Sequence, residues 1–159
     1  MKQVILITSL IATLMACGTK EKSGHEGHDM AMDEANTPIG KAEKEVMDAH
    51  DEVMPRIDNI MKLKKELNGK LTALDSMQGT PTETVRVDEQ KAQVRLLVRR
   101  LTEADSSMMS WMDQYNGDTL KKLPEADALR YLAEQKKLIN DAKSKINQSI
   151  KQAQTYLKQ

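Results

Sequence analysis

The sequence contains no phenylalanine, and its only aromatic residues are one tryptophan and three tyrosines, 3% of 159 residues. Leucine, isoleucine, valine, alanine and methionine fill the apolar positions instead. Strands draw on aromatic and β-branched residues, so this composition favours helices. Hydrophobic residues make up 39% and charged residues 30%, the profile of a single helical domain. We therefore expect an all-α fold.

An excess of charge of either sign is also missing. Lysine and arginine together number 24, as do aspartate and glutamate, so the formal net charge is zero. Without surplus positive charge to attract phosphate groups, we expect no nucleic-acid partner.

Signatures of several enzyme classes do not occur. The chain has no glycine-rich phosphate loop and no Glu-x-x-His pairs of the di-iron type. The segment His25-Glu-Gly-His28 is one residue short of the zinc motif His-Glu-x-x-His. Since the carboxylates are spread over exposed helical positions rather than gathered, we expect a protein that is not an enzyme.

The apolar run from Val4 to Met15 has 12 residues, too few to cross a bilayer as a helix. It follows Lys2 and ends in Leu14-Met15-Ala16-Cys17, which predicts a signal peptide over residues 1–16. The ending resembles the lipobox of bacterial lipoproteins. By that resemblance Cys17 carries a diacylglycerol thioether and becomes the first mature residue. The alternative is a secretory leader with an incidental cysteine.

Cys17 is the only cysteine, so an acylated mature protein has neither a disulfide nor a cysteine nucleophile. Two or more acyl chains on this residue give stable membrane anchoring. We therefore expect a lipid-anchored protein of the cell envelope. Gly18 stands where an aspartate often retains such proteins at the inner membrane, so the resemblance favours the outer membrane.

Residues 17–40 are predicted to form a flexible tether, since they hold four of the seven glycines and almost no large apolar side chain. Within it lie four side chains that bind soft metal ions: His25, His28, Met30 and Met32. This bias is typical of metal-binding tracts. The segment is either a metal-capturing tail or a solvated tether alone.

From about residue 41 the hydrophobic period is helical, and helices are predicted at 41–77, 82–116 and 124–157. In the first, an apolar seam repeats every seven residues: Val46, Val53, Ile60, Leu67 and Leu74. Pro55 should kink this helix, and Thr80-Pro81-Thr82-Glu83 predicts a capping box before the second. Short loops make the helices alternate in direction. The prediction for residues 41–159 is an antiparallel three-helix bundle with coiled-coil-like packing.

Met47, His50 and Met54 share one face of the first helix, because they are spaced by three and four residues. If the chain turns near residue 79, position i of the first helix lies level with about 159 − i of the second. His50 is then level with about Met109, and the neighbouring methionines of the second helix are Met108 and Met112, beside the only tryptophan, Trp111.

Thioether and imidazole ligands select Cu(I) rather than magnesium or calcium. The set Met47, His50, Met54, Met108 and Met112 therefore predicts a site for Cu(I) or another soft metal ion. The alternative is that methionine fills gaps in a helical core and His50 is a hydrogen-bonded core residue.

Lys91, Arg95 and Arg99 form a basic line on the second predicted helix, flanked by acidic residues. A solvated face explains such a line, and a surface for a partner helix is the alternative.

Three segments carry a resemblance to a family: the lipobox leader, Met47-x-x-His-Asp-Glu-Val-Met-Pro55 followed by Leu63-Lys-Lys-Glu-Leu67, and Met108-Met-Ser-Trp-Met112. Together they resemble small helical lipoproteins of Bacteroidota that are often labelled "viral A-type inclusion protein". The resemblance implies a location and a fold, and no activity. The sequence thus predicts a lipid-anchored, non-catalytic envelope protein that binds Cu(I) or a similar ion. The alternative is a structural lipoprotein that recruits a protein partner through a helical face without metal.

Overall fold

The computed structural model describes residues 35–77 and 79–159, and in these residues the secondary structure is helical with no strand. The elements are α2 (Pro38–Val53), the 3-10 turn η1 (Met54–Arg56), α3 (Ile57–Asp75), α4 (Pro81–Gln114), α5 (Gly117–Leu120) and α6 (Glu125–Leu157). The predicted all-α class is confirmed. None of the described helices is long and apolar enough to span a membrane.

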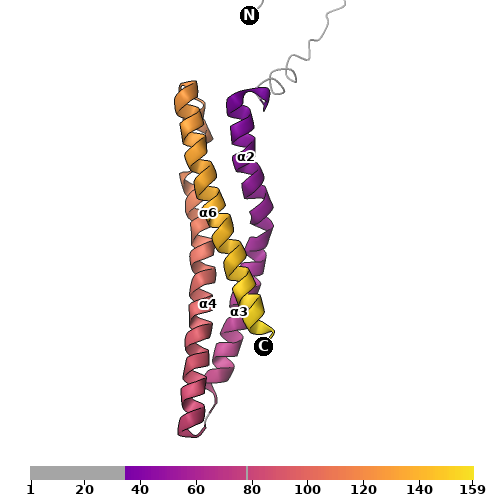
Figure 1. Ribbon diagram of the computed structural model, residues 1–159, viewed down its shortest axis with the longest axis vertical. Helices are drawn as coiled ribbons and strands as arrows, with labels where there is room; N and C mark the ends of the chain where they lie inside the picture. The colour runs from indigo at the N-terminus through magenta and orange to yellow at the C-terminus, as the bar shows by residue number, and fades with distance from the viewer. Residues whose placement is uncertain (1–34, 78) are drawn as a thin grey trace, which may run out of the picture.

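Three long helical stretches lie side by side (Figure 1). The first is α2 with η1 and α3, the second is α4 and the third is α6. Helix α6 packs against both α2 and α4, while α3 packs mainly against α4. Figure 1 shows that the turn between α3 and α4 extends beyond the end of α6, at the opposite end of the molecule from the start of α2.

The first predicted helix, 41–77, is interrupted where Pro55 was expected to kink it. Pro55 has no N–H group to donate to the carbonyl of Asp51, and the chain passes through η1 at this point before it continues as α3. The helical segment also begins earlier than predicted. Thr37 caps it, because its hydroxyl oxygen accepts a hydrogen bond from the Gly40 N–H at 3.0 Å.

The seven-residue seam forms the core along α2 and α3. All five of its residues are buried: Val46, Val53, Ile60, Leu67 and Leu74. They pack against buried residues of α4 such as Leu101 and Met108 and of α6 such as Leu132 and Ile139. Burial of this continuous apolar seam supplies the main favourable free energy for packing the helices.

Polar contacts between α2–η1 and α6 keep one constant register. Lys136 donates to Glu45 at 2.7 Å, Lys143 pairs with Glu52, and Arg56 donates to Asn147 at 2.7 Å. Each pair is separated by 91 residues in the sequence. A constant separation requires the two segments to run parallel, as the first and third stretches of an up-down-up chain do.

Helix α4 begins with the predicted capping box. The Thr80 N–H donates to Glu83 Oε2 at 2.8 Å, and the Glu83 N–H donates to Thr80 Oγ1 at 3.4 Å. The Glu83 carboxylate accepts from the Thr80 N–H and also from the Thr80 hydroxyl, at 2.8 Å, and these two hydrogen bonds, first that of the backbone, lower the pKa of Glu83. Helix α5 was predicted as a loop. It buries Leu120, and the Asn116 side chain caps its first turn through the Thr119 N–H.

We predict that Leu101→Ala lowers the free energy of unfolding by about 2–5 kcal/mol, because Leu101 is fully buried and the change leaves a cavity. The control is Met61→Ala, since 55% of Met61 is exposed, and its effect should stay within about 0.5 kcal/mol. Urea unfolding followed by circular dichroism measures both. Equal effects of the two changes would contradict this description of the core.

Candidate functional site

His50, in the last turn of α2, lies against the single tryptophan of the chain. Its imidazole and the Trp111 indole have centroids 5.5 Å apart and planes tilted by 34°. The sequence predicted Met109 opposite His50, so the register was correct to within two residues. Met109 itself is 37% exposed, whereas Trp111 is buried.

A neighbouring carboxylate orients the imidazole. His50 Nδ1 lies 2.9 Å from Asp51 Oδ1, and the His50 side chain is 19% exposed. In its neutral form the ring can donate from Nδ1 to this carboxylate, which leaves the lone pair on Nε2. Metal-binding histidines are commonly held in this way, with the non-ligating N–H on a carboxylate. Sequence reasoning missed Asp51, although its position beside His50 was a possible signal.

The predicted methionines lie close to His50 or Trp111 along their helices: Met47 and Met54 are about one turn from His50, and Met108 and Met112 flank Trp111 in α4. Met108 is fully buried in α4, whereas Met47, Met54 and Met112 are partly buried and pack against the core. Two contacts, His50–Trp111 and Glu43–Tyr115, determine the register of α2 against α4. In this register Met112 lies at the same height along the helices as Met47. We call His50, Trp111 and these four methionines the His50 cluster.

Tyrosine rings continue the contact between His50 and Trp111. The centroids of Trp111 and Tyr115 are 5.3 Å apart, and those of Tyr115 and Tyr131 are 6.2 Å apart. Tyr115 donates its phenolic hydrogen to Glu43 Oε1 at 2.8 Å, and the Asn116 N–H donates to the Tyr131 oxygen at 2.8 Å. This stack was not predicted from the sequence. The four-residue spacing of Trp111 and Tyr115 was the available signal.

The electrostatics of the stack differ between its rings. Burial, and then the hydrogen bond to Glu43, raise the pKa of Tyr115. The Trp111 Nε1–H is buried and finds no hydrogen-bond acceptor among the described residues. Tyr115 therefore has a proton acceptor in contact, whereas the indole N–H of Trp111 has none among the described residues.

Within residues 35–77 and 79–159, no three histidine, cysteine, aspartate or glutamate side chains come together as a metal site would require. The candidate donors of the His50 cluster are one imidazole and thioethers, which bind soft ions in preference to hard ones. The tail residues His25, His28, Met30 and Met32, like Cys17, lie outside the described residues.

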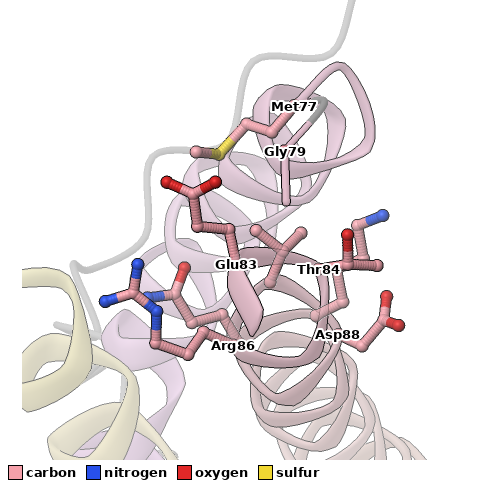
Figure 2. A pocket seen from close by; sticks show the side chains of 9 residues that line it. Met77, Gly79, Glu83, Thr84, Arg86 and Asp88 are labelled. Atoms are coloured by element: carbon pink, nitrogen blue, oxygen red, sulfur yellow. The ribbon is translucent and has the colours of Figure 1, made fainter. Parts of the chain in front are cut away.

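A concave surface lies at the turn between α3 and α4 (Figure 2). Met77, Gly79, Glu83, Thr84, Arg86 and Asp88 are among the residues that line it. The Glu83 carboxylate is engaged by the capping box, and a Cβ at Gly79 would lie only 2.9 Å from Glu83 Cβ. The residues therefore form a tight turn, and their polar groups do not converge on one point as ligands would.

The basic line predicted on the second helix is partly neutralised within the molecule. Lys91 Nζ pairs with Asp75 of α3 at 3.0 Å, and only 17% of the Lys91 side chain is exposed. Arg99 pairs with Glu103 at 3.5 Å along α4. These ion pairs favour the interpretation of a solvated face over that of a partner surface.

Comparisons with protein-family models, with curated proteins and with solved structures found no significant match. The location implied by the lipoprotein resemblance therefore stays a prediction.

We predict that alkaline pH destabilises the protein through Tyr115. The raised pKa means that the folded state holds the phenolic proton more tightly than the unfolded state, in which a tyrosine has a pKa of about 10. The free energy of unfolding should therefore decrease as the pH rises above that value. Tyr115→Phe should reduce this decrease, and Tyr156→Phe, outside the stack, is the matched control. An identical pH dependence in the wild type and Tyr115→Phe would contradict the assignment.

Proposed function

We propose that this protein is a lipid-anchored, non-catalytic three-helix bundle of the bacterial envelope that binds Cu(I), or another soft metal ion, through the His50 cluster. The observation that carries the proposal is the orientation of His50. Its Nδ1 faces the Asp51 carboxylate, so Nε2 is the ring nitrogen left to bind an ion, on a helix face shared with Met47 and Met54.

The surroundings of His50 support a soft ion. The imidazole is mostly shielded from water by packing on Trp111. Met47 and Met54, about one turn from His50, and Met112, next to Trp111, are partly buried. A half-buried set of thioethers offers little to a hard cation, which prefers oxygen ligands. Met108 is fully buried. It either packs only in the core or binds the ion through its thioether from within the bundle.

The tail and the anchor complete the proposal. His25, His28, Met30 and Met32 precede α2 in the sequence and capture the ion, which the His50 cluster then holds. Lipid on Cys17 keeps both near a membrane surface, with the outer membrane favoured.

An anaerobic Cu(I) competition titration tests the metal site. We expect His50→Ala to weaken Cu(I) binding, and Met47→Leu with Met54→Leu to weaken it as well, because leucine keeps the apolar volume and removes the thioether. The control is Met61→Leu, a change of the same chemistry at an exposed position of α3. A chain in which His25, His28, Met30 and Met32 are replaced separates binding by the tail from binding by the cluster.

If His50→Ala and the double leucine variant bind Cu(I) as tightly as Met61→Leu in the tail-substituted chain, the cluster does not bind copper. Binding that is lost with the tail donors alone would restrict metal binding to the tail.

Membrane fractionation tests the anchor. Cys17→Ser removes the acceptor of the lipid, and we expect the protein to move from the membrane fraction to the soluble fraction, since stable anchoring depends on the acyl chains. Ser23→Ala, a change of similar size in the tether, should leave it in the membrane fraction. Retention of Cys17→Ser in the membrane would contradict lipid anchoring through this residue.

One observation favours the second candidate, a lipoprotein that recruits a protein partner. Met77 and Val85 lie at the α3–α4 turn and are each 59% exposed, at the end of the molecule farthest from the start of α2 (Figure 1). Co-purification from detergent extracts of a protein that is lost when Lys91, Arg95 and Arg99 are changed would support recruitment through the basic line. Loss on changing Met77 and Val85 to serine would place the contact at the turn instead.

A further inference from the structure

Three of the four aromatic residues of the chain stack in succession beside His50. The stack leads from His50 in α2 through Trp111 and Tyr115 in α4 to Tyr131 in α6, with centroid separations of 5.5, 5.3 and 6.2 Å. The fourth, Tyr156, lies near the C-terminal end of α6, where its ring contacts Lys70. Because the chain has no phenylalanine, every ring beyond the imidazole is an indole or a phenol, which one-electron oxidants can oxidise.

We propose that Trp111, Tyr115 and Tyr131 form a relay that carries a one-electron oxidation away from the His50 cluster to the partly exposed ring of Tyr131. The relay is independent of copper binding, since its members are side chains already in contact. The oxidants that it intercepts are one-electron oxidants of the carbonate-radical class, which take an electron from an indole and do not add to its ring.

The direction of electron transfer depends on which of the oxidised rings can release its proton to a neighbouring acceptor. Trp111 is 4% exposed, and its indole N–H has no hydrogen-bond acceptor among the described residues. An indole that has lost an electron therefore keeps its proton and remains a strong oxidant. Tyr115 has an acceptor in contact, because its hydroxyl donates to Glu43 Oε1 at 2.8 Å. Loss of an electron from Tyr115 can be accompanied by transfer of its proton to Glu43, and this favours the movement of the oxidation from Trp111 to Tyr115.

Each step balances. The oxidising radical takes one electron from the Trp111 indole and is reduced by it. One electron passes from Tyr115 to the indole, while the phenolic O–H bond of Tyr115 breaks and an O–H bond forms on the Glu43 carboxylate. Tyr131 then supplies one electron to the Tyr115 phenoxyl radical, which takes back the proton from Glu43, and Tyr131 releases its own proton to water. A soluble reductant such as ascorbate restores Tyr131 with one electron and one proton.

The residues protected by such a relay are the methionines around Trp111. Met112 is the next residue in the chain, and Met108 is one helical turn earlier on the same side of α4. Oxidation of a thioether to the sulfoxide turns an apolar side chain into a polar one and disrupts a core. Because Met108 is fully buried, its sulfoxide would be especially damaging to the packing of α4.

Laser photoionisation followed by transient absorption tests the relay in the metal-free full chain. Excitation at the red edge of indole absorption ionises Trp111, the only tryptophan, and an electron scavenger removes the ejected electron. In the wild type we expect the indole radical to decay as a phenoxyl radical appears. In Tyr115→Phe, which keeps the ring and removes the hydroxyl, the indole radical should live several-fold longer and the early phenoxyl signal should be lost.

Two further variants sharpen the test. Glu43→Gln keeps a hydrogen-bond acceptor but removes the base, so the conversion of indole to phenoxyl radical should slow several-fold. Tyr156→Phe is the matched control and should leave the decay unchanged, since Tyr156 lies outside the stack. Circular dichroism and thermal unfolding establish that each variant is folded.

The relay is overturned if the indole radical decays at the same rate in the wild type and in Tyr115→Phe, or if the phenoxyl signal disappears in Tyr156→Phe instead. A second readout is methionine oxidation after a pulse of carbonate radical anions, measured by peptide mass spectrometry. We expect several-fold more sulfoxide at Met108 and Met112 in Tyr115→Phe than in the wild type. Equal oxidation in both proteins would show that the stack gives no protection. Neither readout involves copper, so failure of the relay and failure of the copper proposal are separate results.

Discussion

The apolar seam from Val46 to Leu74 is the constraint on which the rest of the structure depends. Its residues stay buried on both sides of Pro55. A straight α-helix falls behind a seven-residue repeat by about 20° per heptad. A 3-10 helix has 3.0 rather than 3.6 residues per turn, so each of its residues turns about 20° further. The three residues of η1 thereby recover about 60°, roughly the lag of three heptads, and keep α3 in phase with α2.

This phase determines which side chains meet at the end of the molecule where α2 begins. With Val46 and Val53 facing the core, Glu45 and Glu52 lie beside α6 and pair with lysines of that helix. Such exposed ion pairs contribute little to stability individually. Their constant separation of 91 residues nevertheless shows that a single register extends along α2 and η1. The same register brings His50 onto Trp111.

The features predictable from the sequence are those that depend on spacing along one helix or on the length of a turn. The seam, the capping box at Thr80 and the approach of His50 to the Met108–Met112 segment are of this kind. The features that were missed depend on side-chain rotamers and on the rotation of one helix about its axis against another. The contact of His50 with Asp51 requires a particular rotamer. The contact of Tyr115 with Glu43 joins residues 72 apart and depends on the facing of α2 and α4.

The choice of aromatic residues at this end has a cost that packing alone does not explain. Phenylalanine would fill a similar volume without a polar atom, whereas a buried N–H group without a partner costs about 1–3 kcal/mol. Tyr115 and Tyr131 have hydrogen-bond partners in Glu43 and Asn116, but the Trp111 N–H has none among the described residues. Trp111 therefore occupies the most buried position of the stack at some expense in stability. The stability of the core alone therefore does not account for an indole at the position between an oriented imidazole and a hydrogen-bonded phenol.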